Sequence, residues 1–371
     1  MALNRIRLGD YIESSTANNR NLQYGSDLIE GVTNEGVFST PKGNPVDVNL
    51  KPYKIVKNEA FVYNPSRLNL GSIAYRTEGL CIVSHLYIIF YLNEKGKKLI
   101  DPTYLYMYLR RPEFYREVTF RNFGSQRPEF NFKDMSEIVI QLPEISIQKK
   151  YASIYRAMVE NQASYEHGLE DLKLLCDAYI EDLRRDNLCE KIGPYIQRFD
   201  VRNGANGTKN VMGISTTKEF RKPTAKVNRD ELSNYKVVKP RQFGFVQTTH
   251  NEKVFTYAFN NTKKDIVVSS VNEVFSTDET KLLPEYLSMF FNRTEFDRYA
   301  RFHSWGSARE TFTWTDLQEV KIPIVDMQIQ HSLADIYSAY KERKLINERL
   351  KERIKNLCPI LIKGAIDEAK A

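Results

Sequence analysis

The sequence predicts an α+β protein built from two copies of one unit, each a globular part followed by a long helix. Three observations support this fold class. Apolar residues recur from Gln148 to Asp186 in steps of three or four positions, with one step of seven, the spacing of a stripe along one helix face. A second stripe runs from Gln330 to the end of the sequence. The two segments also match each other at a fixed offset of 182 positions, as between Gln148 and Gln330.

The first helical segment is longer than most helices of globular proteins. It contains no proline, and Gly168 is its only glycine. At about 1.5 Å per residue it would be roughly 55–60 Å long, so we expect a coiled-coil partner, which the second segment supplies. Pro359 in the second segment replaces Asp177 of the first, and we expect a kink or an early end there. The predicted helix–helix contacts are Ile154, Leu172, Leu175, Ile336, Ile354 and Leu357.

The repeat extends upstream of both helical segments. The sequence GSQR at 124–127 corresponds to GSAR at 306–309, again with the offset of 182 positions. The match slips by three residues where 81–90 corresponds to 266–275, and then recovers. A repeat of this length is far longer than a solenoid period, so we infer a duplicated domain. The sequence therefore predicts four segments, with globular parts at 1–147 and 189–329 and long helices at 148–188 and 330–371.

Composition limits the possible classes of function. The 371 residues suffice for two or three domains, and a net charge of +7 permits an acidic partner such as nucleic acid without requiring one. The four cysteines form no CxxC or CxxH pair, so we expect no zinc site, and Cys176 and Cys358 should pack as small apolar residues on the helical stripes. No run of eighteen apolar residues and no signal-length apolar segment is present, which predicts a cytoplasmic protein.

The usual catalytic signatures are absent from the sequence. It contains no GxxxxGK[ST] phosphate loop, no HExxH, no GxSxG and no glycine-rich dinucleotide fingerprint. The sequence NPSR at 64–67 is the nearest approach to an amino-methyltransferase tetrapeptide. It lacks the second proline and the aromatic residue that stacks on a flipped base, so we interpret it as a turn. The five histidines are scattered, and we expect structural or surface roles for them.

The repeated Gly-Ser-x-Arg sequences at 124–127 and 306–309 are the strongest candidate sites. Glycine lets a backbone approach a partner closely. A serine hydroxyl and backbone N–H groups can hold a phosphate, and arginine can bind phosphate or guanine through two hydrogen bonds. Both sequences follow basic, aromatic segments. The alternative is a tight turn that starts a strand; the repetition excludes chance but leaves that alternative open.

Taken together, these features resemble the DNA specificity subunit of a Type I restriction–modification system. A Gly-Ser-x-Arg sequence leads through a short apolar run, at 138–148 or 320–330, into a long helix that opens with glutamine, and the whole pattern occurs twice. The segments DPTYLYMYLRRPEF and LPEYLSMFFNRTEF are also similar to that family. The resemblance covers essentially the entire chain and depends on the duplicated architecture more than on any single motif. One departure is that Pro143 and Pro323 differ by two positions in the aligned copies.

The resemblance implies both a fold and a function. Each globular part would be a target recognition domain that reads one half of a split DNA sequence. The two long helices would lie antiparallel as a coiled coil and separate these domains. The chain would perform no chemistry itself. It would place two methyltransferase subunits, and in some complexes two restriction subunits, on double-stranded DNA. S-adenosylmethionine, ATP and Mg²⁺ would then belong to those partners, with no metal in this chain.

The DNA-binding candidates lie in the polar loops, where the two copies diverge most. Loops on a rigid scaffold commonly carry specificity, so we expect two different half-sites. Related domains dock on one face of DNA when their centres are about one helical turn apart, roughly 34 Å. The candidates in the first copy are Arg67, Arg76, Arg121, Ser125, Gln126 and Arg127, and those in the second are Arg221, Lys222, His250, Arg301, His303, Ser307 and Arg309.

Two other classes of function remain as alternatives. The chain could be a coiled-coil adaptor that binds only protein, and strongly salt-dependent binding to duplex DNA would distinguish the two. It could also be a self-sufficient methyltransferase or nuclease, which activity of the purified chain would reveal. The missing catalytic motifs argue against this second alternative.

Overall fold

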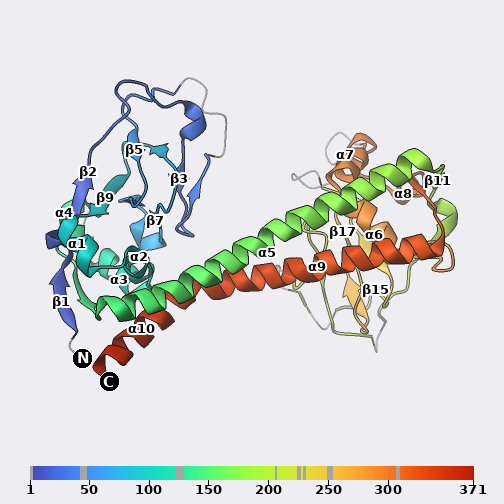
Figure 1. Cartoon of the computed structure of the whole chain (residues 1–371). Helices are drawn as coiled ribbons and strands as arrows, with labels where there is room; N and C mark the ends of the chain where they lie inside the picture. The colour runs from blue at the N-terminus through green and yellow to red at the C-terminus, as the bar shows by residue number, and fades with distance from the viewer. Residues whose placement is uncertain are drawn as a thin grey trace. The chain divides into compact units, whose positions relative to one another are not determined.

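The computed structural model divides the chain into two compact units, and each contains one globular part (Figure 1). The first unit comprises residues 1–165 and 347–371, and the second comprises 166–346. Each unit also takes a portion of both long helices. The mixture of short strands and helices, repeated in both units, confirms the predicted α+β class. The structure describes residues 3–41, 48–121, 129–204, 207–223, 227–228, 231–248, 254–305 and 310–371.

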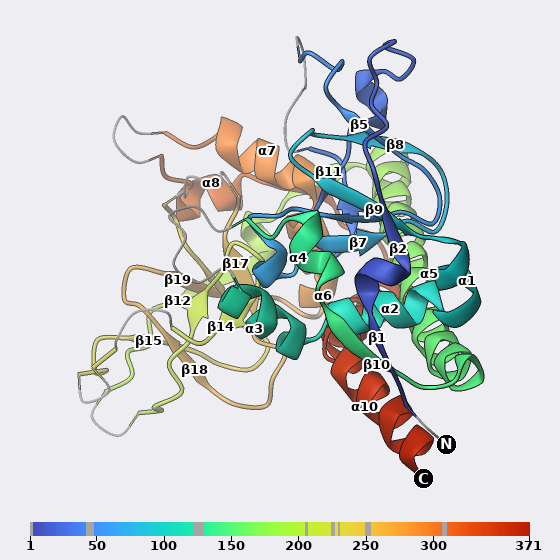
Figure 2. The same cartoon turned by 90° about the vertical axis from the view of Figure 1, so that its left-hand side faces the viewer.

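The first unit is built on a four-stranded antiparallel sheet with the strand order β2-β9-β6-β7. Figure 2 labels β2, β9 and β7 of this sheet. Among the described residues of this unit are also three two-stranded antiparallel sheets and several short helices. The strands of the main sheet are β2 (Ile12–Ser15), β9 (Ile88–Leu92), β6 (Phe61–Tyr63) and β7 (Ile73–Tyr75). The strand pairs are β1 (Asn4–Arg7) with β10 (Val139–Leu142), β3 (Gly31–Val32) with β4 (Phe38–Ser39), and β5 (Lys54–Val56) with β8 (Cys81–Val83). The helices are α1 (Glu94–Leu99), α2 (Pro102–Leu109), α3 (Pro112–Arg121) and α4 (Phe132–Ser136), with 3₁₀ turns η1 (Leu8–Asp10), η2 (Ser26–Leu28) and η3 (Leu68–Leu70).

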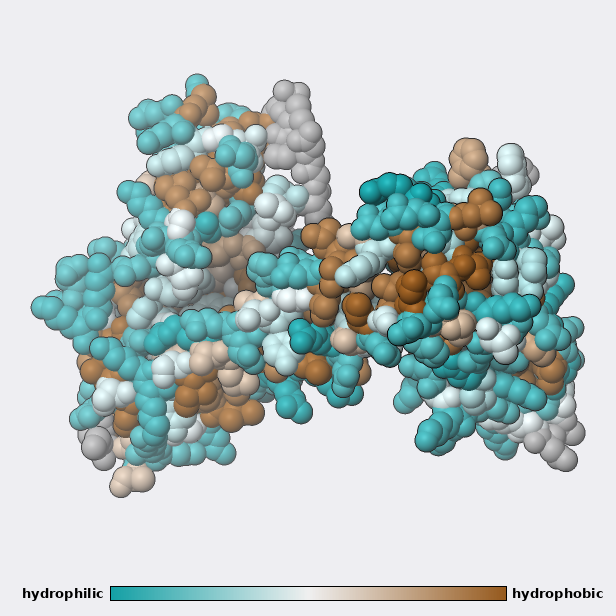
Figure 3. Space-filling model, turned by 45° about the vertical axis from the view of Figure 1, so that its right-hand side comes forward, coloured by the Kyte–Doolittle hydropathy of each residue, from teal (hydrophilic) through white to brown (hydrophobic). Residues whose placement is uncertain are grey.

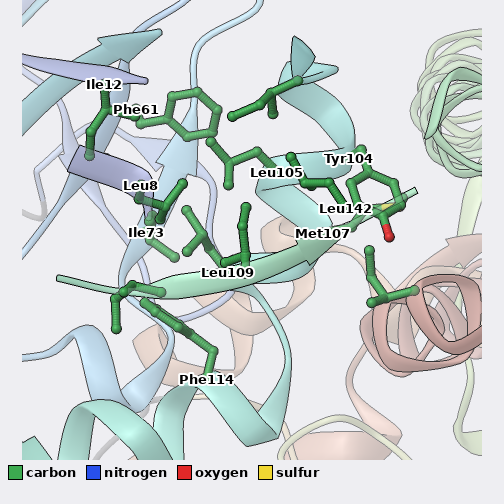
Figure 4. Close-up of a cluster of buried hydrophobic side chains, with 14 of the residues drawn as sticks. Leu8, Ile12, Phe61, Ile73, Tyr104, Leu105, Met107, Leu109, Phe114 and Leu142 are labelled. Carbon is green, nitrogen blue, oxygen red and sulfur yellow. The ribbon is translucent and has the colours of Figure 1, made fainter. Parts of the chain in front are cut away.

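Helix α2 supplies much of the core of the first unit. Asp101 caps its start by accepting a hydrogen bond from the Tyr104 N–H at 2.9 Å, and Pro102 occupies the first turn. The buried side chains of α2 lie close to Phe61 and Ile73 of the main sheet (Figure 4). Burying this apolar surface is the main favourable contribution to folding.

The second unit repeats the topology of the first. Its four-stranded antiparallel sheet has the order β12-β19-β16-β17, in which each strand corresponds to one of the first unit. The agreement confirms the duplication inferred from the sequence. The strands of the main sheet are β12 (Ile196–Phe199), β19 (Glu273–Thr277), β16 (Phe243–Phe245) and β17 (Tyr257–Phe259). The strand pairs are β11 (Cys189–Lys191) with β20 (Lys321–Pro323), β13 (Gly213–Ile214) with β14 (Phe220–Arg221), and β15 (Lys236–Val238) with β18 (Ile266–Val268). The helices are α6 (Pro284–Asn292), α7 (Thr294–Phe302) and α8 (Trp314–Gln318), with the 3₁₀ turn η4 (Gly193–Tyr195).

The predicted long helices are α5 (Ile145–Asp186) and α9 (Met327–Lys355), and α9 is followed by α10 (Leu357–Lys370). The expected interruption near Pro359 is present, since the helix breaks at Asn356 and Pro359 lies in the first turn of α10.

None of the helices within the described residues is long and apolar enough to cross a membrane.

The end of each copy's helix completes the core of the other copy. In the first unit, Cys358 and Ile362 of α10 join the core that also contains the start of α5. In the second unit, Cys176 and Ile180 of α5 join a core that contains the start of α9. The helices within the first unit are antiparallel, because the beginning of α5 contacts the end of α10, as in the ion pair of Lys150 with Glu368 at 2.8 Å (Figure 1).

A buried glutamine joins each globular part to its following helix. In the first unit, the Gln148 side-chain oxygen accepts a hydrogen bond from the Asp101 N–H at 3.0 Å. Its amide nitrogen donates to the carbonyl oxygens of Leu99 at 3.0 Å and Pro143 at 2.8 Å. The Gln148 residue is fully buried. One side chain thereby fixes the start of α2, the end of β10 and the first turns of α5.

Gln330 makes the same three hydrogen bonds in the second unit. Its oxygen accepts from the Leu283 N–H at 2.9 Å, and its nitrogen donates to the carbonyls of Lys281 and Val325, both at 2.8 Å. Gln330 is also fully buried. Glutamine suits this position because its amide both donates and accepts, which neither glutamate nor leucine of similar size can do.

We expect Gln148→Ala and Gln330→Ala each to lower the free energy of unfolding by roughly 2–5 kcal/mol. Each change leaves three backbone polar groups without their hydrogen-bond partner and opens a cavity. Chemical denaturation measures the change. Gln141→Ala and Gln328→Ala are matched controls, since both side chains are exposed and should cost less than about 0.5 kcal/mol. Equal stabilities for the buried and exposed variants would show that the two buried glutamines do not hold the globular parts to their helices.

Candidate nucleic-acid interface

Three segments of the first unit converge around the predicted turn at 64–67. The Phe130 N–H donates to the carbonyl oxygen of Pro65 at 3.0 Å, which brings the segment after 122–128 against this turn. Helix α3 packs against η3, which begins one residue after Arg67. The turn, the end of α3 and the Phe130 segment therefore form one corner of the unit, which we call the first corner.

The second unit forms the corresponding corner. The Phe312 N–H donates to the Gln247 carbonyl oxygen at 2.8 Å, and Gln247 corresponds to Pro65 in the repeat. Trp305 and Thr311 exchange backbone hydrogen bonds of 3.2 and 3.0 Å across 306–309. Helix α7 ends at Phe302, three residues before Trp305. These segments make up the second corner.

Several of the predicted DNA-binding residues gather at these corners. Arg67 and Arg301 are exposed, and neither forms an ion pair with a described residue. Arg121 ends α3 and pairs with Glu117 at 3.0 Å, leaving its side chain about one third exposed. The His303 ring lies 4.3 Å from the Tyr299 ring, measured between centroids. The corners thus present cationic side chains that an anionic partner can reach.

Other predicted residues lie away from the corners. Arg76 is only 11% exposed, pairs with Glu30 at 2.7 Å and lies 4.8 Å from the centre of the Phe38 ring. Its charge is therefore used inside the unit, where it holds the β3–β4 hairpin. Arg221 and Lys222 are exposed on and after β14, whose hairpin packs over Gly244 of β16. Six further predicted residues lie outside the described residues and stay predictions: Ser125, Gln126, Arg127, His250, Ser307 and Arg309.

The sequence matches the protein family described as Type I restriction modification DNA specificity domain. The match occurs twice, over residues 7–172 and 184–356, and so covers most of the chain. The chain belongs to this DNA specificity family. The two matched regions follow the two copies found in the sequence. No curated protein sequence matches the chain significantly.

Three solved structures of the same class are similar to this specificity-family chain. The S subunit of a Type I restriction–modification system from M. genitalium is 11% identical, with a TM-score of 0.60 and coverage of 98% of this chain and 96% of that one. This likeness shows a shared fold. An HsdS subunit from Thermoanaerobacter tengcongensis is 14% identical (TM-score 0.41, coverage 98% and 96%). A chain from a structure describing complex assembly and conformational transition of the type I R-M system is 13% identical (TM-score 0.49, coverage 99% and 97%).

Hydrophobic residues at the two corners of the specificity-family chain were missed by the sequence reasoning. Phe120, Phe302 and Trp305 are between 72% and 82% exposed. Large apolar residues are usually assigned to the core, which is why they were overlooked. The signal was nevertheless present, since Phe120 and Phe302 are separated by the repeat offset and fall off the buried faces of their helices.

The six predicted helix–helix contacts divide into two groups. Leu172, Ile336, Ile354 and Leu357 are partly buried. Ile154 and Leu175 keep 40% and 43% of their surface exposed, while Ala152 and Cys176 beside them on the helix are buried. A stripe of apolar residues is wider than one contact line, so the sequence alone did not identify its deepest positions. The role of Ile154 and Leu175 in the helix contact stays a prediction.

A metal site is not evident in the part of the chain that the structure describes. No group of three His, Cys, Asp or Glu side chains lies close enough there to hold a metal ion. Cys176 and Cys358 are both buried, which confirms the packing expected for them. Burial raises the pKa of the Cys358 thiol to about 11.

We expect Ile180→Ala and Ile362→Ala each to reduce the free energy of unfolding by roughly 2–5 kcal/mol, because each side chain is buried where a helix end closes a core. Thermal or chemical denaturation provides the measurement. The matched controls Leu174→Ala and Ile360→Ala lie on the same helices with 70% and 65% exposure, and should change stability little. A similar cost for all four variants would argue against reciprocal closure of the cores.

Proposed function

We propose that this chain is the DNA recognition subunit of a Type I restriction–modification complex and that each unit reads one half of a bipartite duplex target. The observation that carries this proposal is that corresponding corners of the two units, in a chain from this family, both carry an exposed arginine. Phosphate contacts from such cations would set the register, and side chains reaching the base edges would set the sequence. Because the residues at the two corners differ, the two half-sites should differ.

The chain would recognise DNA without catalysing a reaction. The absence of catalytic signatures from its sequence supports this part of the proposal. Two methyltransferase subunits, with restriction subunits where the system has them, would supply S-adenosylmethionine, ATP and Mg²⁺ chemistry. The exposed apolar side chains of Leu174 and Tyr179 on α5 offer these partners a contact. Figure 3 shows hydrophobic residues in brown between hydrophilic ones in teal on one face of the molecule.

The paired helices would set the spacing between the two half-sites. Helix α5 is continuous from the first unit into the second, so any change in its length alters the path between them. Within the first unit, the Gln162 amide donates to the Asn347 side-chain oxygen at 3.0 Å, which marks one level at which α5 and α9 face each other. A helix pair that keeps a fixed length would act as a ruler for the DNA gap.

Arg67→Ala and Arg301→Ala should each weaken binding of the purified full chain to a duplex selected from random DNA. If the arginine binds a phosphate, the slope of log affinity against log salt should fall by about one, with all sequences affected alike. If it reads a base, specificity should relax at one position of one half-site by about 1–3 kcal/mol. Fluorescence anisotropy across a salt series gives both quantities.

Lys98→Ala and Arg185→Ala are matched controls, since both residues are exposed, lie on α1 and α5, and belong to neither corner. They should change affinity little at a fixed salt concentration. Unchanged binding in Arg67→Ala and Arg301→Ala would remove the corners from the interface. A wild-type chain that binds no duplex, yet binds methyltransferase subunits, would favour the adaptor alternative instead.

The proposal that the helix pair sets the gap between the half-sites is tested by inserting seven residues into both helices at the level of Gln162 and Asn347. Seven residues are close to two helical turns, so the helix faces return nearly to register. The insertion adds about 10 Å, and DNA rises about 3.4 Å per base pair. We therefore expect the gap between the half-sites to grow by about three base pairs, as mapped by methylation with a reconstituted complex.

An insertion into α5 alone is the control for this experiment. It moves every later contact of α5 along α9 and should abolish methylation. The two half-site sequences should stay the same in the double insertion, because the corners are unaltered. Changed half-sites with an unchanged gap would refute the ruler while leaving DNA recognition intact.

A further inference from the structure

Two phenylalanines at corresponding positions are exposed, one in each unit. Phe120 lies in the last turn of α3 with 82% of its surface exposed, and Phe302 ends α7 with 78% exposed. The same helices bury Phe114 and Phe296, also at corresponding positions. Both helices therefore have a core face that takes up an aromatic ring, and both direct a second ring into solvent.

An arginine precedes each exposed phenylalanine by one helical turn. Arg116 and Phe120 are four positions apart, as are Arg298 and Phe302, so each pair shares a helix face. The Arg116 side chain is 74% exposed and makes a surface ion pair with Glu113 at 3.3 Å. Arg298 is exposed as well. Each corner thus carries a cation and an aromatic ring side by side on its surface.

This combination fits duplex DNA better than an apolar protein surface. A phenyl ring in water is unfavourable, and its occurrence at the same place in both copies indicates that a partner covers it. Proteins that deform DNA insert phenylalanine between base steps, while nearby basic residues hold the backbone. A neutral protein surface would offer these two exposed arginines no anionic group, whereas the phosphates of DNA lie within reach of both.

Building on the proposed function, we propose that Phe120 and Phe302 each insert between adjacent base pairs of the half-site read by their own unit, while Arg116 and Arg298 bind the neighbouring phosphates. The contact would unstack one base step in each half-site. Because base steps differ in how easily they unstack, the deformation would contribute specificity at positions that no side chain reads directly.

The test uses the purified full chain and a duplex that the wild-type chain has selected from a random pool. The fluorescent base 2-aminopurine replaces each base in turn, because its emission rises when its neighbours unstack. We expect a rise at one step in each half-site. Phe120→Ala should remove the rise in one half-site and Phe302→Ala in the other, with binding weaker by roughly ten- to a hundredfold. The salt slope should stay unchanged, since no charge is removed.

Three variants separate the insertion from a general effect on the surface. Phe120→Trp keeps an aromatic ring and should retain the fluorescence rise. Leu86→Ala and Val271→Ala alter other exposed apolar residues at corresponding positions, 61% and 72% exposed, and should retain both affinity and fluorescence.

The outcomes distinguish this inference from the proposed function. A wild-type chain that selects no duplex would defeat the proposed function itself. A wild-type chain that selects a duplex without unstacking any step, or alanine variants with normal affinity, would overturn the insertion alone. Alanine variants that bind DNA normally but no longer bind methyltransferase subunits would also overturn it, and would assign the two rings to protein docking.

Discussion

Closure of each core by the helix end of the other copy is the constraint on which the fold depends. Ile362 of α10 is fully buried in the first unit, and Ile180 of α5 is almost fully buried in the second. These residues correspond in the repeat, so one apolar pattern performs the same task twice. Neither copy buries its apolar surface using its own residues alone. The long helices and the duplication are therefore a single structural solution, in which losing one helix end exposes the core of the other copy.

The buried glutamines convert this packing into a fixed orientation. Apolar contacts are non-directional and permit small rotations, whereas the three hydrogen bonds of Gln148 or Gln330 require one geometry. Each clamp ties a helix start to the globular part that carries the corner. A recognition surface must be held rigidly to discriminate bases by hydrogen-bond geometry, so the clamp is the link between the packing of the helices and the proposed reading of DNA.

The sequence predicted the architecture because the repeat is encoded in residue identity and spacing. The offset between Gln148 and Gln330 located two similar units, and the helical period located α5 and α9. Side-chain environments were not predictable in this way. Arg76 was a candidate for DNA until the structure paired it with Glu30, which lies far away in sequence. Phe120 was overlooked for the opposite reason, since hydrophobicity predicts burial and only the folded unit shows that its ring is exposed.

The two copies have also diverged so that each unit fits its own helix end. Arg293 of the second unit is buried and pairs with Asp177 at 3.2 Å and with Glu181, whose pKa it holds below the usual value. The helix end that serves the first unit carries Pro359 and Lys363 at those two positions. Docked against Arg293, it would remove two of the three carboxylates that surround this buried charge, leaving Glu295 alone at 3.6 Å, and would add another cation, which is unfavourable. The first unit needs no carboxylates at these positions, because its corresponding Arg111 lies over the Tyr108 ring, with the guanidinium carbon 3.7 Å from the ring centre. Charge complementarity therefore specifies which helix end closes which core, and the duplicated chain retains one arrangement of its two halves.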